Sequence, residues 1–177
     1  MMKSIQELRV LAIDPTTRGY AFAVLEGPHQ LIDWGVKSVR PARQDLCLAG
    51  VTAQIRFFAP AVIVLENASG ADSRRCARVR RLVQAIRTLA AKNRARTRLI
   101  SQREIKAAFA SARAVTKHQI AVAIAGLLPE LADRLPRYRK PWMSEDYRTN
   151  IFDAAALALT YFQLRDKRRQ SRAMDSR

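Results

Sequence analysis

Apolar residues in the first part of the chain follow the patterns of three strands. Residues 9–13 (RVLAI) are a short, branched apolar run that ends at Asp14, and residues 20–25 (YAFAVL) are a second apolar run. Residues 31–38 (LIDWGVKS) alternate between apolar and polar, which is typical of a strand. Because the segments that join these runs are short and contain Pro and Gly, we expect an antiparallel meander.

The rest of the chain mixes helical and strand patterns. Residues 44–58 have the apolar spacing of a helix and are followed by Pro60. Residues 61–65 (AVIVL) are the most apolar strand-like run, so we expect a central strand that is parallel to its neighbour across the helical crossover. The remaining patterns predict a helix at 74–96, a strand at 97–101, helices at 102–109, 116–128 and 150–164, and a loop at 129–144. This order predicts an α/β fold in which a five-stranded mixed sheet, first an antiparallel meander and then parallel strands, is flanked by helices.

Length and composition fit one domain. The chain has 177 residues, of which 49% are hydrophobic, and this is enough for one sizeable core. We place the domain at residues 1–165 and expect residues 166–177 to be a basic, disordered tail. No apolar run approaches about 18 residues and no signal peptide is recognisable, so the sequence predicts a cytoplasmic protein with no membrane partner.

The charge of the chain indicates a polyanionic partner. Lys and Arg number 32 against 15 Asp and Glu, which gives a formal net charge of +17. Such an excess is strongly self-repelling in a domain of this size, so we expect the chain to bind nucleic acid. In the predicted helix at 74–96 one face is apolar and the other is rich in arginine, and we assign Arg74, Arg78 and Arg81 to phosphate contacts.

Three acidic residues stand at positions that this topology makes significant. Asp14 and Glu66 each end a strongly apolar strand, and parallel neighbouring strands end at the same edge of a sheet. Asp153 opens the last predicted helix, and the small residues at 154–156 would let that helix pack close to the sheet. Three carboxylates together repel one another unless a cation neutralises them. Such oxygen ligands suit Mg²⁺ or Mn²⁺, and two of these ions can promote hydrolysis of a phosphodiester.

Each acid also has a local, structural interpretation. Asp14 precedes Pro15 and two threonines, and it could cap that turn. Asp153 could be an N-cap or a first-turn acid of its helix. Glu66 is less readily explained in this way, because it ends a five-residue apolar run. The three residues in this order favour one shared site.

The segments that contain these acids resemble the RuvC Holliday-junction resolvases. LAIDPTTRGYAFAVLE is similar to the first hairpin of the family, VIVLE to its acidic strand end, and DAAALAL to its last helix. The stretch REIKAAFASARAVTKHQIAVAIAGLLPEL is similar to a lysine-containing part of the family, and it places Lys106 and Lys117 on the family's lysines. The resemblance covers residues 9–164, which is nearly the whole predicted domain.

The resemblance implies an RNase H-like fold and a homodimer that nicks paired strands at four-way DNA junctions during recombination or repair. It implies that Asp14, Glu66 and Asp153 are catalytic ligands of Mg²⁺ or Mn²⁺, with two ions in each site and no small-molecule cofactor. It also implies that Lys106 and Lys117 contact DNA phosphates.

One departure from the family concerns the fourth metal ligand. The family has an acid or a histidine one helical turn before its last Asp, where this chain has Asn150. An amide oxygen can ligate a hard cation, although it brings no charge. Asp146 would be an alternative ligand if residues 147–150 form a loop; in a continuous helix it would lie about 10 Å along the axis from Asp153, too far to share an ion.

Other departures leave further interpretations open. Residues 67–70 (NASG) lack the aromatic that the family inserts at the junction centre, and Thr16 stands where the family usually has Gly. One alternative is therefore a nucleic-acid-binding relative that has lost catalysis, and another is a nuclease for branched DNA in general or for RNA. A third is an actin-like sugar or acetate kinase, whose first hairpin also follows an Asp. Such kinases need a Gly-rich phosphate turn and a second domain, whereas residues 15–18 (PTTR) lack that glycine pair.

Overall fold

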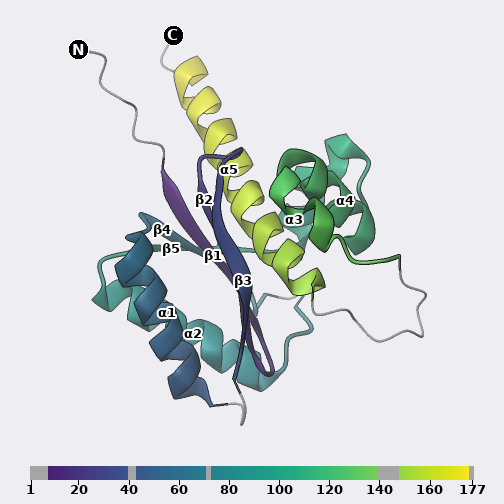
Figure 1. The fold of residues 1–177 in the computed structure, drawn as a ribbon. Coiled ribbons are helices and arrows are strands. Elements are labelled where there is room, and N and C mark those ends of the chain that lie inside the picture. Colours follow the sequence, from purple (N-terminus) through teal and green to yellow (C-terminus); the bar gives the residue numbers. More distant parts are fainter. Residues whose placement is uncertain (1–7, 40–42, 71–72, 139–147, 176–177) are drawn as a thin grey trace.

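A five-stranded mixed sheet forms the centre of the protein, with the strand order β3-β2-β1-β4-β5 (Figure 1). The computed structural model describes residues 8–39, 43–70, 73–138 and 148–175. β1 pairs antiparallel with β2, and β2 with β3, whereas β1, β4 and β5 are parallel. This confirms the predicted meander followed by parallel strands. The strands are β1 (Arg9–Thr16), β2 (Gly19–Glu26), β3 (Leu31–Ser38), β4 (Val62–Glu66) and β5 (Arg96–Ile100).

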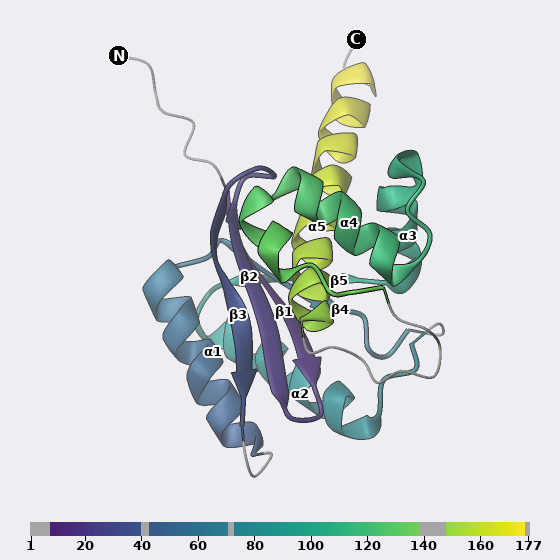
Figure 2. The same cartoon turned by 45° about the vertical axis from the view of Figure 1, so that its right-hand side comes forward.

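Helices cover both faces of this sheet (Figures 1 and 2). The first two helices pack on one face, and the last three lie on the other. The α-helices are α1 (Gln44–Phe58), α2 (Ala77–Lys92), α3 (Gln102–Phe109), α4 (Lys117–Leu127) and α5 (Thr149–Asp175). Two short 3₁₀ helices are η1 (Ala110–Ala112) and η2 (Pro129–Arg134), the second of which lies within the predicted loop.

The alternation of side chains along β1 and β4 assigns each residue to one of two cores. Leu11 and Ile13 face α1 and α2, together with Ile63 and Leu65 from β4. Their sequence neighbours face α5, because successive strand residues point to opposite sides of a sheet. The residues on that second side include Val10, Ala12, Val62 and Val64.

The long helix α5 lies directly on the sheet. Ala154, Ala155 and Ala158 are fully buried, and they belong to the same core as Ala12 and Ala23 of the strands beneath. Small side chains on both surfaces allow the helix backbone to approach the sheet closely. The expectation that small residues at 154–156 let this helix pack against the sheet is therefore confirmed.

α2 is shorter at both ends than the predicted helix at 74–96. Cys76 is extended, with φ −69° and ψ 163°, so that residues 74–76 lie outside the helix. At the other end Arg94 has a positive φ of 56°, and the Ala95 amide donates a hydrogen bond to the Ala90 carbonyl, which closes the helix after Lys92. Helix propensity alone does not fix either end, because it contributes only a few tenths of a kcal/mol, about 0.7 at most, for an ordinary residue.

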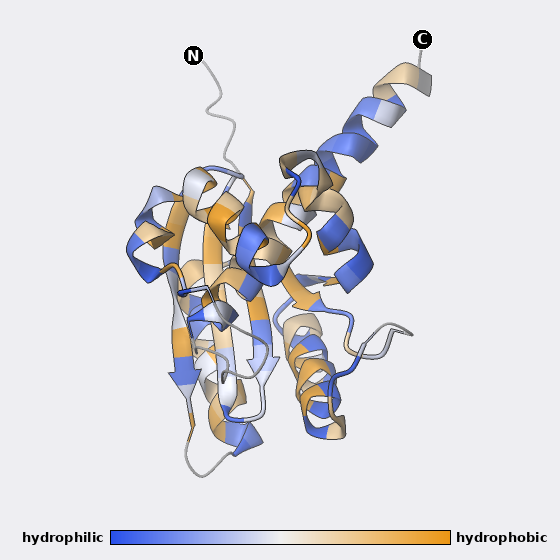
Figure 3. Ribbon diagram, turned by 90° about the vertical axis from the view of Figure 1, so that its right-hand side faces the viewer, coloured by the Kyte–Doolittle hydropathy of each residue, from blue (hydrophilic) through white to orange (hydrophobic). Residues whose placement is uncertain are grey.

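The prediction of a disordered tail from residue 166 is wrong as far as Asp175, because α5 continues to that residue. The outer part of α5, residues 165–174, is exposed from residue 166 onward and stands clear of the sheet (Figure 3). Arg, Lys and Gln are good helix formers, and adding residues to an existing helix is far easier than starting a new one. In the part of the chain that the structure describes, no helix has the length and apolar character needed to cross a membrane.

Candidate metal centre and nucleic-acid interface

The strand register places Asp14 beside Glu66. β1 and β4 are parallel, and Ile13 is paired with Leu65, so the next residues along the two strands are Asp14 and Glu66. Their preceding residues, Ile13 and Leu65, face α1 and α2, so the side chains of both acids point to the opposite face, on which α5 lies. Asp14 is 1% exposed and Glu66 is 5% exposed, so neither carboxylate is solvated as a surface acid would be.

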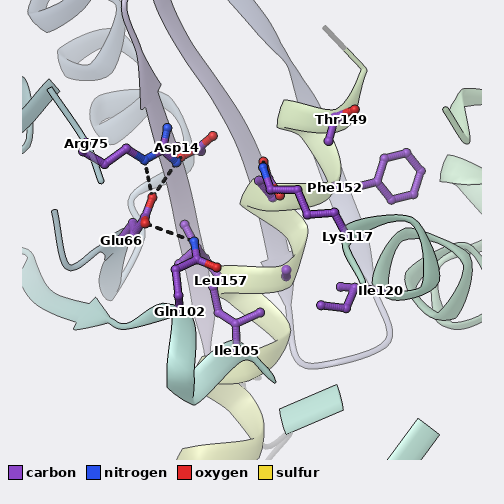
Figure 4. A pocket seen from close by; sticks show the side chains of 12 residues that line it. Asp14, Glu66, Arg75, Gln102, Ile105, Lys117, Ile120, Thr149, Phe152 and Leu157 are labelled. Carbon is purple, nitrogen blue, oxygen red and sulfur yellow. Dashed lines mark hydrogen bonds and ion pairs between the residues drawn. The ribbon is translucent and has the colours of Figure 1, made fainter. Parts of the chain in front are cut away.

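Arg75 bridges these two carboxylates from the segment that precedes α2 (Figure 4). Its Nη2 atom lies 2.5 Å from Oδ1 of Asp14 and 2.5 Å from Oε2 of Glu66. Its Nε atom donates a second hydrogen bond to Oε2 of Glu66 at 2.6 Å. One guanidinium thus neutralises part of the negative charge that the adjacent strand ends create.

Gln102 contacts Glu66 from the other side. Its Nε2 atom donates a hydrogen bond to Oε1 of Glu66 at 3.0 Å (Figure 4). Gln102 is the first residue of α3, and this position is set by a capping box between Ser101 and Glu104. Since Ile100 at the end of β5 is paired with Glu66, α3 begins at the same edge of the sheet as the two acids.

Asp153 lines the same pocket. It is in the second turn of α5, and its Oδ2 atom accepts a hydrogen bond from Nζ of Lys117 at 3.0 Å. Lys117 is the first residue of α4 and is itself held there by the capping box of Thr116 and Gln119. The pocket is lined by Asp14, Glu66, Arg75, Gln102, Ile105, Lys117, Ile120, Thr149, Phe152, Asp153, Ala156 and Leu157 (Figure 4).

The carboxyl group of Asp14 has an unusual environment. Burial raises the pKa of Asp14 to about 8; Arg75 opposes this shift, while the nearby charges of Asp153 and Glu66 add to it. Among the described residues, no hydrogen-bond donor reaches its second oxygen, Oδ2, although that atom is buried. A buried carboxylate oxygen without a donor is costly, and a bound cation would remove that cost.

The Arg75 guanidinium carries a fixed positive charge in this pocket. Burial disfavours that charge, but the carboxylates of Asp14 and Glu66 outweigh burial and raise the pKa of Arg75 above its ordinary value. Arg75 therefore stays protonated and acts as a counter-ion to the two acids.

The two local interpretations of the acids do not describe these contacts. Asp153 lies beyond the first turn of α5, so it is neither an N-cap nor a first-turn acid. The hydrogen bond that Asp14 accepts comes from Arg75, a residue 61 positions away, rather than from the turn that follows. Both acids face the shared pocket, as the sequence led us to expect.

The three acids nevertheless do not form a ready-made chelate. Within the described residues, no three His, Cys, Asp or Glu side chains are close enough together to hold one metal ion. Asn150 is the second residue of α5, and the residues of that turn that line the pocket are Thr149 and Phe152. Asp146 lies outside the described residues.

Of the basic residues assigned to DNA contacts, Lys117 lines the pocket and the other four do not. Lys106 is exposed in the last turn of α3. Arg74, Arg78 and Arg81 are exposed on the segment before α2 and on α2 itself. Their positions are compatible with contacts to a long polyanion, because such contacts need exposed cations and no enclosed site.

Sequence reasoning missed Arg75 and Gln102. The S-x-x-E signature at residues 101–104 would have located the start of α3, and hence Gln102, at the edge that carries Asp14 and Glu66. Arg75 stands in an arginine-rich run that continues into α2, and no local signal separates it from its neighbours. Its role depends on the tertiary position of two acids that are distant in sequence.

Comparisons with known proteins identify the fold. No protein-family model and no curated protein sequence matches the chain. Among solved structures, RuvC from Thermus thermophilus is similar at a TM-score of 0.64 and 20% identity, over 90% of this chain and 97% of that one. T. thermophilus RuvC in complex with a Holliday junction substrate is similar at a TM-score of 0.63 and 19% identity, over 89% of this chain and 96% of that one. The yeast mitochondrial Holliday junction resolvase Ydc2 is similar at a TM-score of 0.63 and 14% identity, over 97% of this chain and 87% of that one. The chain therefore has the RuvC-like, RNase H-like fold that the sequence predicts.

Proposed function

We propose that this protein is a divalent-metal-dependent, structure-selective DNA endonuclease that resolves Holliday junctions by paired nicking. The observation that carries the proposal is the adjacency of Asp14 and Glu66 at the end of two parallel strands, with Asp153 in the same pocket. The likeness in fold to proteins that are resolvases, or that were solved with a junction, supports the junction as substrate.

The residues of the pocket fit a hard divalent cation. The buried Oδ2 atom of Asp14 has no donor among the described residues, and two further carboxylates line the same pocket. We infer that Asp14, Glu66 and Asp153 hold Mg²⁺ or Mn²⁺, with Asn150 or Asp146 as candidate additional ligands if two ions bind. A bound divalent ion would supply an activated water and a counter-charge for the phosphate and the leaving 3′-oxygen.

The protein itself binds and orients the substrate. Lys117 lies at the pocket with its ammonium group close to Asp153, where it can contact the phosphate that is to be cleaved. Arg74, Arg78, Arg81 and Lys106 present exposed positive charge and would hold the duplex arms through their phosphates. A two-fold homodimer would place two such pockets on symmetric strands of one junction.

Nicking of a synthetic four-way junction tests this function. Wild type is expected to cleave in Mg²⁺ or Mn²⁺ and to be inactive in EDTA. Asp14→Asn, Glu66→Gln and Asp153→Asn are expected to bind the junction but to lose cleavage by at least about 100-fold. Glu130→Gln, which removes an exposed acid in η2, is the matched control and should cleave as wild type does. Wild type that leaves the junction intact in both metals would contradict the proposal.

A catalytically impaired DNA-binding protein is the second candidate. It is favoured by one observation, that Arg75 and Lys117 occupy positions on the carboxylates that ligate metal in the first proposal. The same assay separates the two candidates, because this protein would bind the junction without metal-dependent cleavage. Comparing a junction, a flap, a plain duplex and an RNA–DNA hybrid then determines the substrate class.

A further inference from the structure

Arg75 occupies the position between Asp14 and Glu66 that a shared cation would take. Its Nη2 atom is 2.5 Å from an oxygen of each carboxylate. A divalent ion ligated by the same two oxygens would lie between about 2.0 Å from both, as for Mg²⁺, and about 2.6 Å, as for Ca²⁺. The nitrogen and the ion would therefore overlap, and only one of them can be present at a time.

We propose that Arg75 is a displaceable internal counter-ion, which fills the cation position of the metal-free protein and must withdraw before a divalent ion can bind there. This inference rests on the proposed function, because it assigns the same two carboxylates to the metal. It adds a cost to metal binding: the protein must first break the Arg75 contacts with Asp14 and Glu66. It also gives the metal-free fold a cation for its buried acids.

The surroundings of Arg75 allow this withdrawal. Its side chain is 26% exposed, whereas those of Asp14 and Glu66 are 2% and 6% exposed, so the arginine can leave towards solvent while the acids cannot. The residue lies before α2, outside regular secondary structure. Its backbone amide donates to Oγ of Ser73 and its carbonyl accepts from Nη1 of Arg80, so the main chain is held by contacts that do not involve the pocket.

Competition between Arg75 and a divalent ion for one position should weaken metal binding. When only a fraction of the protein is competent to bind a ligand, the apparent dissociation constant is the intrinsic one divided by that fraction. Removing Arg75 makes the cation position available in every molecule. Divalent metal should therefore bind more tightly to a variant without Arg75, although the metal-free form of that variant is less stable.

Calorimetric titration of the full chain with Mn²⁺, in the absence of DNA, is the direct test. Arg75→Met keeps the length of the side chain and removes its charge, and it is expected to tighten Mn²⁺ binding by about tenfold or more. Arg75→Lys keeps one charge but cannot place two nitrogens on the acids, so an intermediate affinity is expected. Arg74→Met is the matched control: it removes the same charge from the adjacent exposed residue and should change the affinity by less than about threefold.

The ¹⁵Nε–Hε signal of Arg75, assigned by its loss in Arg75→Lys, provides an independent measurement in the wild type. In EDTA this proton is hydrogen-bonded to Glu66, and it should exchange with water slowly. Saturation with Mg²⁺ is expected to shift the signal and speed its exchange. If Arg75→Met does not fold without metal, it is refolded in Mn²⁺, and Arg75→Lys and the Arg75 signal still test the proposal.

Two results would overturn the inference. One is equal Mn²⁺ affinity in wild type, Arg75→Met and Arg74→Met, and the other is an Arg75 signal that does not change at saturating Mg²⁺. If either accompanies metal-dependent junction cleavage, the displacement is wrong while the nuclease function stands. If no variant binds Mn²⁺ at all, the displacement and the metal-dependent function are both rejected.

Discussion

Nζ of Lys117 lies 3.0 Å from Oδ2 of Asp153, and this pair joins the start of α4 to α5 in the lining of the pocket. The Lys117 side chain is 57% exposed and that of Asp153 is 25% exposed, so the pair is well hydrated. A pair of this kind contributes about 0–1 kcal/mol to stability. Its position at the pocket therefore matters more for chemistry than for folding.

Lys117→Ala is expected to lower the single-turnover rate of junction nicking by about 100-fold, because under the proposed function it removes a cation beside the phosphate that is cleaved. The free energy of unfolding, measured in urea, should fall by less than about 1 kcal/mol. Lys106→Ala is the comparison: Lys106 is exposed and does not line the pocket, so its loss should weaken DNA binding and leave the rate of the bound complex unchanged. Equal losses of rate in the two variants would contradict this distinction.

Asp14 should make the stability of the metal-free protein fall as the pH rises. Its pKa is about 8 in the folded protein against an ordinary value of 3.8. Between these values the folded state holds a proton that the unfolded state has lost, so the free energy of unfolding decreases with pH in this window and levels off above it.

Asp14→Asn cannot ionise and should lack this slope. The free energy of unfolding of the variant minus that of wild type is expected to be about 1–3 kcal/mol larger at pH 8 than at pH 4.5. Urea unfolding in EDTA measures this difference. Asp133→Asn, at an exposed position in η2, is the control for the substitution itself and should show no such difference. Parallel pH dependence in all three proteins would show that Asp14 is not protonated by burial.

The close packing of α5 on the sheet should not tolerate a larger side chain. Ala155 is fully buried in the core that α5 shares with the strands, so Ala155→Leu is expected to lower the free energy of unfolding by about 1–3 kcal/mol or more. Ala173→Leu makes the same change at an exposed position of the same helix and should change it by less than about 0.5 kcal/mol. Urea unfolding of both variants in parallel measures the difference.

The outer part of α5 should contribute to DNA affinity. It carries five basic residues and one acid, and at this density like charges three and four positions apart repel one another. Replacing Arg168, Arg169 and Arg172 by Gln is expected to reduce junction affinity and to flatten the plot of log affinity against log salt by up to about three units of slope. The midpoint of urea unfolding should stay within error of wild type, and an unchanged salt slope would exclude this contact.

Hydrophobic patterning was sufficient to predict most of the fold. The bounds of α1 and α3 agree with the predicted helices at 44–58 and 102–109, because each has a buried stripe and a clear end signal. The interior position of β4, between β1 and β5, agrees with its continuous burial, which an apolar run of branched residues indicates. Such features depend on residues that are neighbours in sequence.

The arrangement inside the site depends on distant residues, and it could be predicted only in part. The strand ends placed Asp14 and Glu66 at one edge, but the register that makes them adjacent is a property of the folded sheet. Arg75 was missed because the contacts that distinguish its side chain come from two acids that are nine and 61 residues away. The helical state of the chain beyond residue 165 was missed because the charges there favour disorder, whereas the buried part of α5 has already formed the helix that these residues extend.

α5 is a single helix of 27 residues that includes both Asp153 and the basic outer end, so it connects these two regions mechanically. From Asp153 to Arg172 the helix axis advances about 28 Å, roughly the length of eight base pairs of duplex DNA. Because the helix is continuous, a tilt applied at its far end can be transmitted along the axis to the turn that carries Asp153. How a duplex lies along the molecule would thereby help to set where one acid of the pocket stands.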